Sequence, residues 1–179
     1  MPLIKEHSLI MGVYIVNLSS HTDQRGQFTE IFRKEWFPQS SWNELQSNRS
    51  VSEAGVLRGL HYHHHQVDYW HVVHGALRAG LVDLRRSSPT QGNAQIIEIK
   101  DSDDLGLFIP SGVAHGFLGL TKVTLLYIVD KYYNGSDEYG IAWDDPAIGL
   151  DWGVESPNIS NRDRRNPRLE TIPQVELPG

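Results

Sequence analysis

The stretch RGLHYHHHQVDYWHVVHG, residues 58–75, carries the strongest signal in this chain. Within it His61, His63 and Asp68 have the spacing H-x-H-x4-D, and Gly75 follows seven residues after the aspartate. Alternate side chains of a strand share a face, so His61 and His63 are expected to point the same way. Asp68 can return to them from a paired strand. This arrangement can build either a metal site or a proton-transfer site.

Outside this stretch the chain also has the pattern of a mainly β protein. Short apolar or alternating runs are separated by turn residues such as Gly92, the Pro110-Ser111-Gly112 turn and Asn134-Gly135. Short strands at this spacing predict a β-sandwich or barrel, because no long helices alternate with them. Residues 34–45 form the best short helical or irregular segment. The runs predicted as strands are 13–16, 27–32, 56–63, 69–73, 77–84, 94–99, 107–110, 116–120 and 123–129.

Length and composition limit the function classes. A chain of 179 residues predicts one domain, 1–179, with residues 166–179 as a loose C-terminal tail. The net charge of −6 argues against nucleic-acid binding, which needs a basic surface. The chain has no cysteine, which excludes disulfides and thiolate zinc sites. No apolar run approaches ~18 residues, so we expect a cytoplasmic protein with no membrane partner.

A second chemical cluster lies at Pro110-Ser111-Gly112-Val113-Ala114-His115, with the pattern P-x-G-x-x-H. Together with H-x-H-x4-D-x6-G it closely resembles the paired motifs of the cupin superfamily, with aspartate where that superfamily usually has glutamate. The resemblance implies a cupin-type β-barrel or jelly roll with a few short helices, in which these residues surround a pocket.

Within the cupins, the chain resembles the dTDP-4-dehydrorhamnose 3,5-epimerase family, which acts on nucleotide-linked 4-keto sugars. The order and spacing of the matching blocks hold from about residue 12 to about residue 165, which is more specific than one short motif. The matching blocks include residues 23–26 (DQRG), 55–62 (GVLRGLHY), 82–90 (VDLRRSSPT), 110–117 (PSGVAHGF) and 140–152 (GIAWDDPAIGLDW).

The resemblance assigns roles that suit the reaction. Epimerisation beside a ketone needs a base to remove a carbon-bound proton and an acid to return one from the opposite face. By resemblance the base is His61 paired with Asp163, and the acid is Tyr127. A carboxylate partner fixes the imidazole tautomer and stabilises the imidazolium that forms. The positions expected to bind substrate are Arg25, Glu30, Gln46, Asn48, Arg58, His115 and Tyr133.

One departure from the family changes the charge of the site. By resemblance, the family has an enolate-stabilising lysine where this chain has Asp68, and it usually has glutamine where this chain has His63. Reversing the charge that faces an oxyanion hinders that mechanism. One alternative is therefore a metal-dependent cupin enzyme in which His61, His63, Asp68 and His115 ligate one divalent ion. Another is a non-catalytic sugar-nucleotide binder.

We favour a metal-free isomerase without a cofactor. The predicted function is epimerisation of a nucleotide-linked 4-keto-6-deoxy sugar by His and Tyr proton transfer through an enolate, in deoxysugar or surface-polysaccharide synthesis. The predicted partners are the nucleotide-diphosphate sugar and a second copy of the chain in a homodimer. By resemblance, residues 1–20 are a candidate N-terminal strand for exchange between the two copies.

Overall fold

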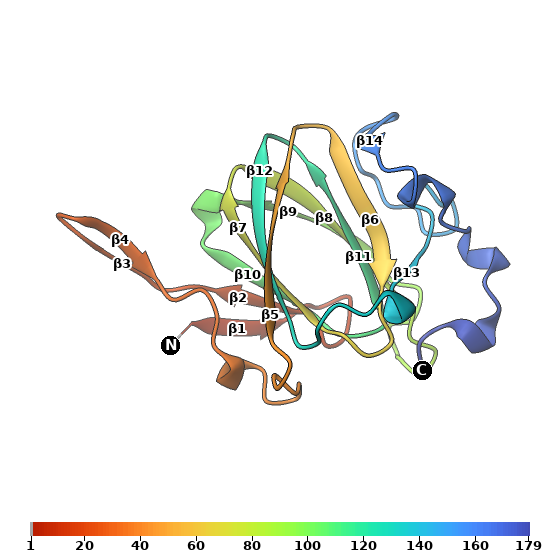
Figure 1. The fold of residues 1–179 in the computed structure, drawn as a ribbon, viewed down its shortest axis with the longest axis horizontal. Coiled ribbons are helices and arrows are strands. Elements are labelled where there is room, and N and C mark those ends of the chain that lie inside the picture. Colours follow the sequence, from red (N-terminus) through yellow and green to blue (C-terminus); the bar gives the residue numbers. More distant parts are fainter. Residues whose placement is uncertain (1) are drawn as a thin grey trace.

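The computed structural model describes residues 2–179, and its regular structure is almost entirely β (Figure 1). One six-stranded sheet has the order β1-β2-β10-β7-β12-β5. The second has the order β13-β6-β11-β8-β9, with β14 parallel beside β6. The strands are β1 Leu3–Glu6, β2 Tyr14–Asn17, β3 Ser20–Asp23, β4 Gly26–Thr29, β5 Gln46–Ser52, β6 Val56–Tyr62, β7 Asp68–His74, β8 Ala76–Asp83, β9 Ala94–Lys100, β10 Leu105–Ile109, β11 Val113–Gly119, β12 Val123–Val129, β13 Tyr139–Gly140 and β14 Asn158–Ile159.

The helical segments are all single 3₁₀ turns. They are η1 Lys34–Trp36, η2 Asp101–Asp103, η3 Gly135–Asp137, η4 Asp163–Arg165, η5 Leu169–Thr171 and η6 Gln174–Glu176. The expected mainly β fold with a few short helices is confirmed. Among residues 2–179, no helix has the length and apolar character needed to cross a bilayer.

Strand alternation divides the buried side chains into three clusters. Residues such as Val72, Leu77 and Leu125 fill the space between the two sheets. The outer face of the second sheet is covered by the segment after β12, whose Trp152 packs in the same cluster as β6 and β8 residues. The outer face of the first sheet is covered by the segment around Phe37. Both sheets are therefore buried on two faces over much of their area, which holds the strands around the interior rigidly.

The hairpin of β3 and β4 extends away from both sheets (Figure 1). By contrast, β1 and β2 lie on the sheet of their own chain, where β2 pairs with β10. Exchange of residues 1–20 between two copies stays a prediction.

The C-terminal segment expected to be a loose tail is packed at its end. Leu177 and Pro178 are buried, and the Arg86 N–H donates a hydrogen bond to the Pro178 carbonyl at 2.9 Å. The apolar side chain of Leu177 packs in the interior, and the polar composition of the segment did not indicate this.

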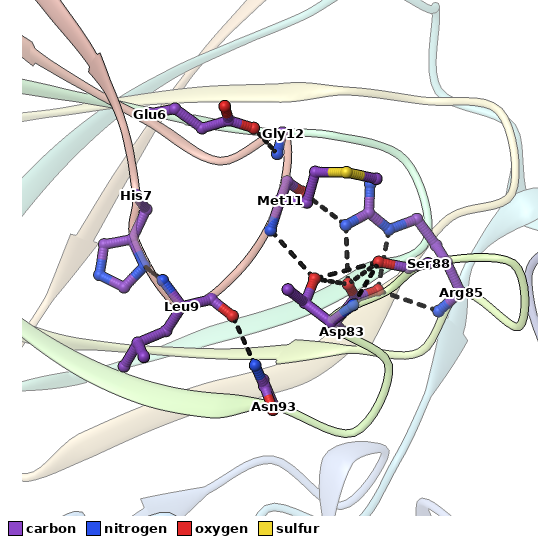
Figure 2. A network of polar contacts seen from close by, with 10 residues as sticks. Glu6, His7, Leu9, Met11, Gly12, Asp83, Arg85, Ser88 and Asn93 are labelled. Carbon is purple, nitrogen blue, oxygen red and sulfur yellow. Dashed lines mark hydrogen bonds and ion pairs between the residues drawn. The ribbon is translucent and has the colours of Figure 1, made fainter.

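A polar network centred on the buried Asp83 ties the turn before β2 to the loop after β8 (Figure 2). The Asp83 carboxylate is fully buried and accepts hydrogen bonds from the side chains of Arg85, Ser88 and Thr90. Arg85 also donates to the Met11 carbonyl at 2.6 Å, and the Met11 N–H donates to Thr90 Oγ1 at 3.0 Å. The network therefore ties the turn between β1 and β2 to the loop that follows β8 of the second sheet.

Candidate active site

A cavity of about 560 Å³ lies between the two sheets, lined by strands of both and by the loop after β12. Along β5, β7, β12 and the end of β6 its lining follows the two-residue repeat of a strand, because alternate side chains point inward. The inward sets are Gln46, Asn48 and Ser50 on β5; His61, His63 and His65 on and after β6; Gln66, Asp68 and Trp70 at β7; and Leu125, Tyr127 and Val129 on β12.

His61 lines this cavity and contacts Asp163, which lies 102 positions further along the chain. Their Nε2 and Oδ1 atoms are 2.7 Å apart. Asp163 lies in η4 with its side chain almost wholly buried, and it also accepts the Gly59 N–H at 3.3 Å. Burial opposes ionisation of this carboxyl, but the hydrogen bonds from His61 and Gly59 outweigh it and lower its pKa. An ionised Asp163 places the imidazole proton on Nε2 and leaves the lone pair of Nδ1 free.

The strand β6 can carry His61 to this position because it passes very close to β11. His61 is opposite His115 in the register of the two strands. Gly59 has φ of +119°, and a Cβ on it would lie 2.7 Å from the Cα of Gly116. Only glycine at position 59 permits both this backbone conformation and this approach.

Tyr127 lines the same cavity from the facing sheet, where it is opposite Trp70 and Asn48. Burial raises the pKa of its phenol, and the negative charge of Asp68 raises it further. Tyr127 is therefore protonated at neutral pH, as a proton donor must be.

Asp68, the residue at the family's lysine position, has an exposed fraction of 4%. Its two oxygens accept hydrogen bonds from Gln66 Nε2 at 2.9 Å and Trp70 Nε1 at 3.2 Å. His115 Nε2 lies 3.7 Å from Asp68 Oδ2. Burial lowers the pKa of His115, and the Asp68 carboxylate offsets this only in part. Asp68 therefore faces a neutral imidazole inside the cavity and not the solvent.

Of the four candidate metal ligands, the structure brings three together. One ligand atom each of His63, Asp68 and His115 lies within 4.8 Å of the others. His61 is not part of this group, and its Nε2 is bonded to Asp163. The proton-transfer residues and the three acceptors are thus separate clusters on the wall of one cavity.

Most of the residues predicted to bind substrate line the cavity, and two do not. Arg25 lies on the projecting hairpin, where it pairs with Asp23, and Glu30 pairs with Arg33 beside a separate hollow. In a single chain these two side chains are outside the cavity. The predicted residues that do line it are Gln46, Asn48, Arg58, His115 and Tyr133.

Several polar residues of the cavity wall were not predicted from the sequence. Lys131 continues the inward repeat of Tyr127 and Val129 past the end of β12, and Glu44 continues that of β5. Extending the two-residue repeat from Tyr127 would have found Lys131. Arg162 and Glu138 form an ion pair at the wall, and only their neighbours in the chain, such as Asp163, hint at their location.

The chain resembles known proteins over almost its whole length. The family model described as dTDP-4-dehydrorhamnose 3,5-epimerase matches residues 7–171. The spore coat polysaccharide biosynthesis protein SpsL of Bacillus subtilis is 38% identical over 156 residues, which cover 82% of this chain and 99% of that protein.

Two solved structures with bound nucleotide sugars are also similar. The epimerase RmlC of Legionella pneumophila, in complex with dTDP-4-keto-L-rhamnose, has a TM-score of 0.91 at 30% identity, covering 99% of this chain and 98% of that one. The 3'-monoepimerase ChmJ of Streptomyces bikiniensis, in complex with dTDP-quinovose, has a TM-score of 0.89 at 32% identity, covering 97% and 92%. The matched residues and the fold shared with these epimerases agree: this chain belongs to the dTDP-4-dehydrorhamnose 3,5-epimerase family of isomerases.

Proposed function

We propose that this chain epimerises a nucleotide-linked 4-keto-6-deoxy sugar, with His61 as the base and Tyr127 as the acid. The observation that carries the proposal is the 2.7 Å contact of His61 with a buried Asp163, in a cavity that Tyr127 also lines. The similarity to SpsL supports a role in deoxysugar or surface-polysaccharide synthesis. A cytoplasmic location stays a prediction.

The chemistry follows from the acidity of carbons beside a ketone. Nδ1 of His61 removes the proton from C3 or C5, and the electron pair of the broken C–H bond moves to the C4 oxygen as an enolate. Asp163 stabilises the imidazolium that results. Tyr127 then donates its phenolic proton to the same carbon from the opposite face, and the carbonyl re-forms. Both proton-transferring groups belong to the chain itself, so these transfers use no cofactor.

The cationic residues of the wall suit a diphosphate. Arg58, whose Nε donates to Ser52 Oγ at 2.9 Å, lines the cavity together with Lys131 and Arg162. An arginine fork can donate two hydrogen bonds to one phosphate. Arg25 and Glu30 can take their predicted binding role only if the projecting hairpin reaches the cavity of a second copy, as the predicted homodimer would allow.

Solvent exchange tests the proposal directly. A dTDP-linked 4-keto-6-deoxy sugar is incubated with the protein in deuterated water, and deuterium is counted by mass spectrometry and located by proton NMR. We expect deuterium at C3, at C5 or at both, with inversion at each labelled carbon. The number of labelled carbons separates a 3,5-epimerase from a single-centre enzyme. Binding of the nucleotide sugar without any exchange would instead indicate a non-catalytic binder.

Tyr127→Phe should separate exchange from inversion. The variant keeps the ring but lacks the proton donor, so inversion should fall by about 10²-fold. His61 can still remove the proton and return a deuteron to the same face, so deuterium should enter the substrate with retained configuration. Both quantities are read from one NMR time course. Tyr14→Phe is the matched control, because Tyr14 lies in the cluster on the outer face of the first sheet. Undiminished inversion in Tyr127→Phe would assign the acid role to another residue.

A further inference from the structure

Three side chains that can each offer a ligand atom to a metal ion converge on the cavity wall beside the proposed acid and base. The ligand atoms are one ring nitrogen each of His63 and His115 and one carboxylate oxygen of Asp68. They come from the end of β6, from β11 and from β7, so three different strands deliver them to one place. Nothing in the proposed proton transfers uses them.

Backbone carbonyls fix the tautomers of both histidines. His63 Nδ1 lies 2.6 Å from the Asp137 carbonyl oxygen, and His115 Nδ1 lies 3.0 Å from the Val113 carbonyl oxygen. A carbonyl oxygen can only accept, so each Nδ1 carries a hydrogen and donates it. An imidazole that carries its hydrogen on Nδ1 has its lone pair on Nε2, and the Nε2 of neither histidine forms a hydrogen bond within residues 2–179. Metal-ligating histidines are oriented by the same kind of contact.

Asp68 brings a negative charge to this group of side chains. Its hydrogen-bond donors, Gln66 and Trp70, are neutral. It forms no ion pair with a lysine or arginine anywhere in the described part of the chain. The 3.7 Å from Asp68 Oδ2 to His115 Nε2 is too long for a shared proton. A buried carboxylate needs a compensating partner, and a small cation among the three acceptors would supply it.

We infer that His63, Asp68 and His115 form a binding site for one divalent transition-metal ion. Two imidazoles and one carboxylate suit ions such as Zn²⁺, Fe²⁺, Mn²⁺ or Ni²⁺. Three protein ligands leave at least one coordination position open. This set differs from the four-ligand hypothesis, because His61 is committed to Asp163 and stays available as a base. The inference also departs from the metal-free enzyme that we favoured from the sequence.

The site explains the exchange of a family lysine for Asp68, a point that rests on the proposed function. When bound, the ion would supply a positive charge that polarises the ketone oxygen, which is the role assigned to the lysine. The two departures from the family then have one explanation. Asp68 replaces the family's lysine and His63 replaces its glutamine, and both residues are ligands of the same cation site.

Metal binding is measured directly on protein without a polyhistidine tag. The full chain is stripped with a chelator, and Zn²⁺ is titrated in by calorimetry, with elemental analysis for stoichiometry. Co²⁺ is a second probe, because its visible absorption reports nitrogen and oxygen ligands. We expect one ion per chain. Asp68→Asn and His63→Gln should each weaken binding by about 100-fold or more, because loss of a ligand costs at least as much as loss of its outer contacts.

The controls distinguish metal binding at this site from metal binding by other histidines and from the epimerase activity. His74→Gln removes an exposed histidine outside the cavity and should leave binding unchanged. His63→Gln covers the case in which the buried Asp68 variant fails to fold, since His63 is only partly buried. Binding that is absent, or that is unaffected by these ligand substitutions, overturns the inference. Metal binding without deuterium exchange would reject the proposed function alone, and exchange without metal binding would reject this site alone.

Discussion

Replacing His61 by asparagine should lower both solvent exchange and inversion by about 10²- to 10⁴-fold. The side chain is the proposed base, and asparagine cannot accept a carbon-bound proton. The rate of deuterium entry into the 4-keto sugar measures the first step alone, so this variant should lose exchange, which Tyr127→Phe retains. His74→Asn is the matched control, since it removes an imidazole outside the cavity. A His61→Asn variant that exchanges at the normal rate would place the base elsewhere.

Asp163→Asn tests the pair of His61 and Asp163 by changing the tautomer of the His61 imidazole. An asparagine amide can donate to Nε2 of His61, which moves the ring hydrogen to Nδ1 and removes the lone pair that faces the substrate. We therefore expect a loss of similar size with nearly unchanged substrate affinity. Parallel urea unfolding curves of this variant and the natural protein check that the fold persists. A variant that keeps full turnover would show that the 2.7 Å contact is structural only.

Asp83→Ala should be strongly destabilising, at about 3–5 kcal/mol of unfolding free energy. It removes the shared acceptor of Arg85, Ser88 and Thr90 and leaves the largely buried Arg85 guanidinium without its carboxylate (Figure 2). The free energy is measured by urea unfolding. Glu155→Ala is the control, because Glu155 is exposed, and its effect should stay within about 0.5 kcal/mol. Most single substitutions destabilise a protein by about 1 kcal/mol. If Asp83→Ala lowered the unfolding free energy by less than this, the network would contribute little to stability.

The pH dependence of that loss has a defined sign. Burial opposes ionisation of Asp83, but its hydrogen bonds with Arg85, Ser88 and Thr90 outweigh burial and lower its pKa below that of an unfolded aspartate. Its stabilising contribution is therefore complete above the unfolded pKa and disappears as the pH falls through the lower folded pKa. The difference in unfolding free energy between the natural protein and Asp83→Asn should shrink over that acidic range. A difference that grows on acidification would contradict the assignment.

Local pattern predicted most of the strands but missed one that lines the cavity. β5 has the sequence QSNRSVS, and its inward residues Gln46, Asn48 and Ser50 are polar because they face the cavity. An apolar alternation is absent, so the segment does not look like a strand until its pairing with β12 is seen. Strand signals depend on burial in an apolar core, and a cavity wall does not provide one.

The fold class, the family and the candidate proton-transfer residues His61, Asp163 and Tyr127 could all be predicted from the chain alone. Strand periodicity is local, and the family motifs keep their order along the chain, so both can be found without coordinates. The surroundings of Asp68 could not be predicted in this way. Whether a carboxylate faces solvent, an arginine or two imidazoles depends on strand register and on residues far away in the chain. The motif spacing offered His63, Asp68 and His115 as one of several candidate groupings, but it did not decide among them. The pairing of β7 with β10 and β12, and of β6 with β11, buries Asp68 beside His63 and His115 and leaves His61 with Asp163.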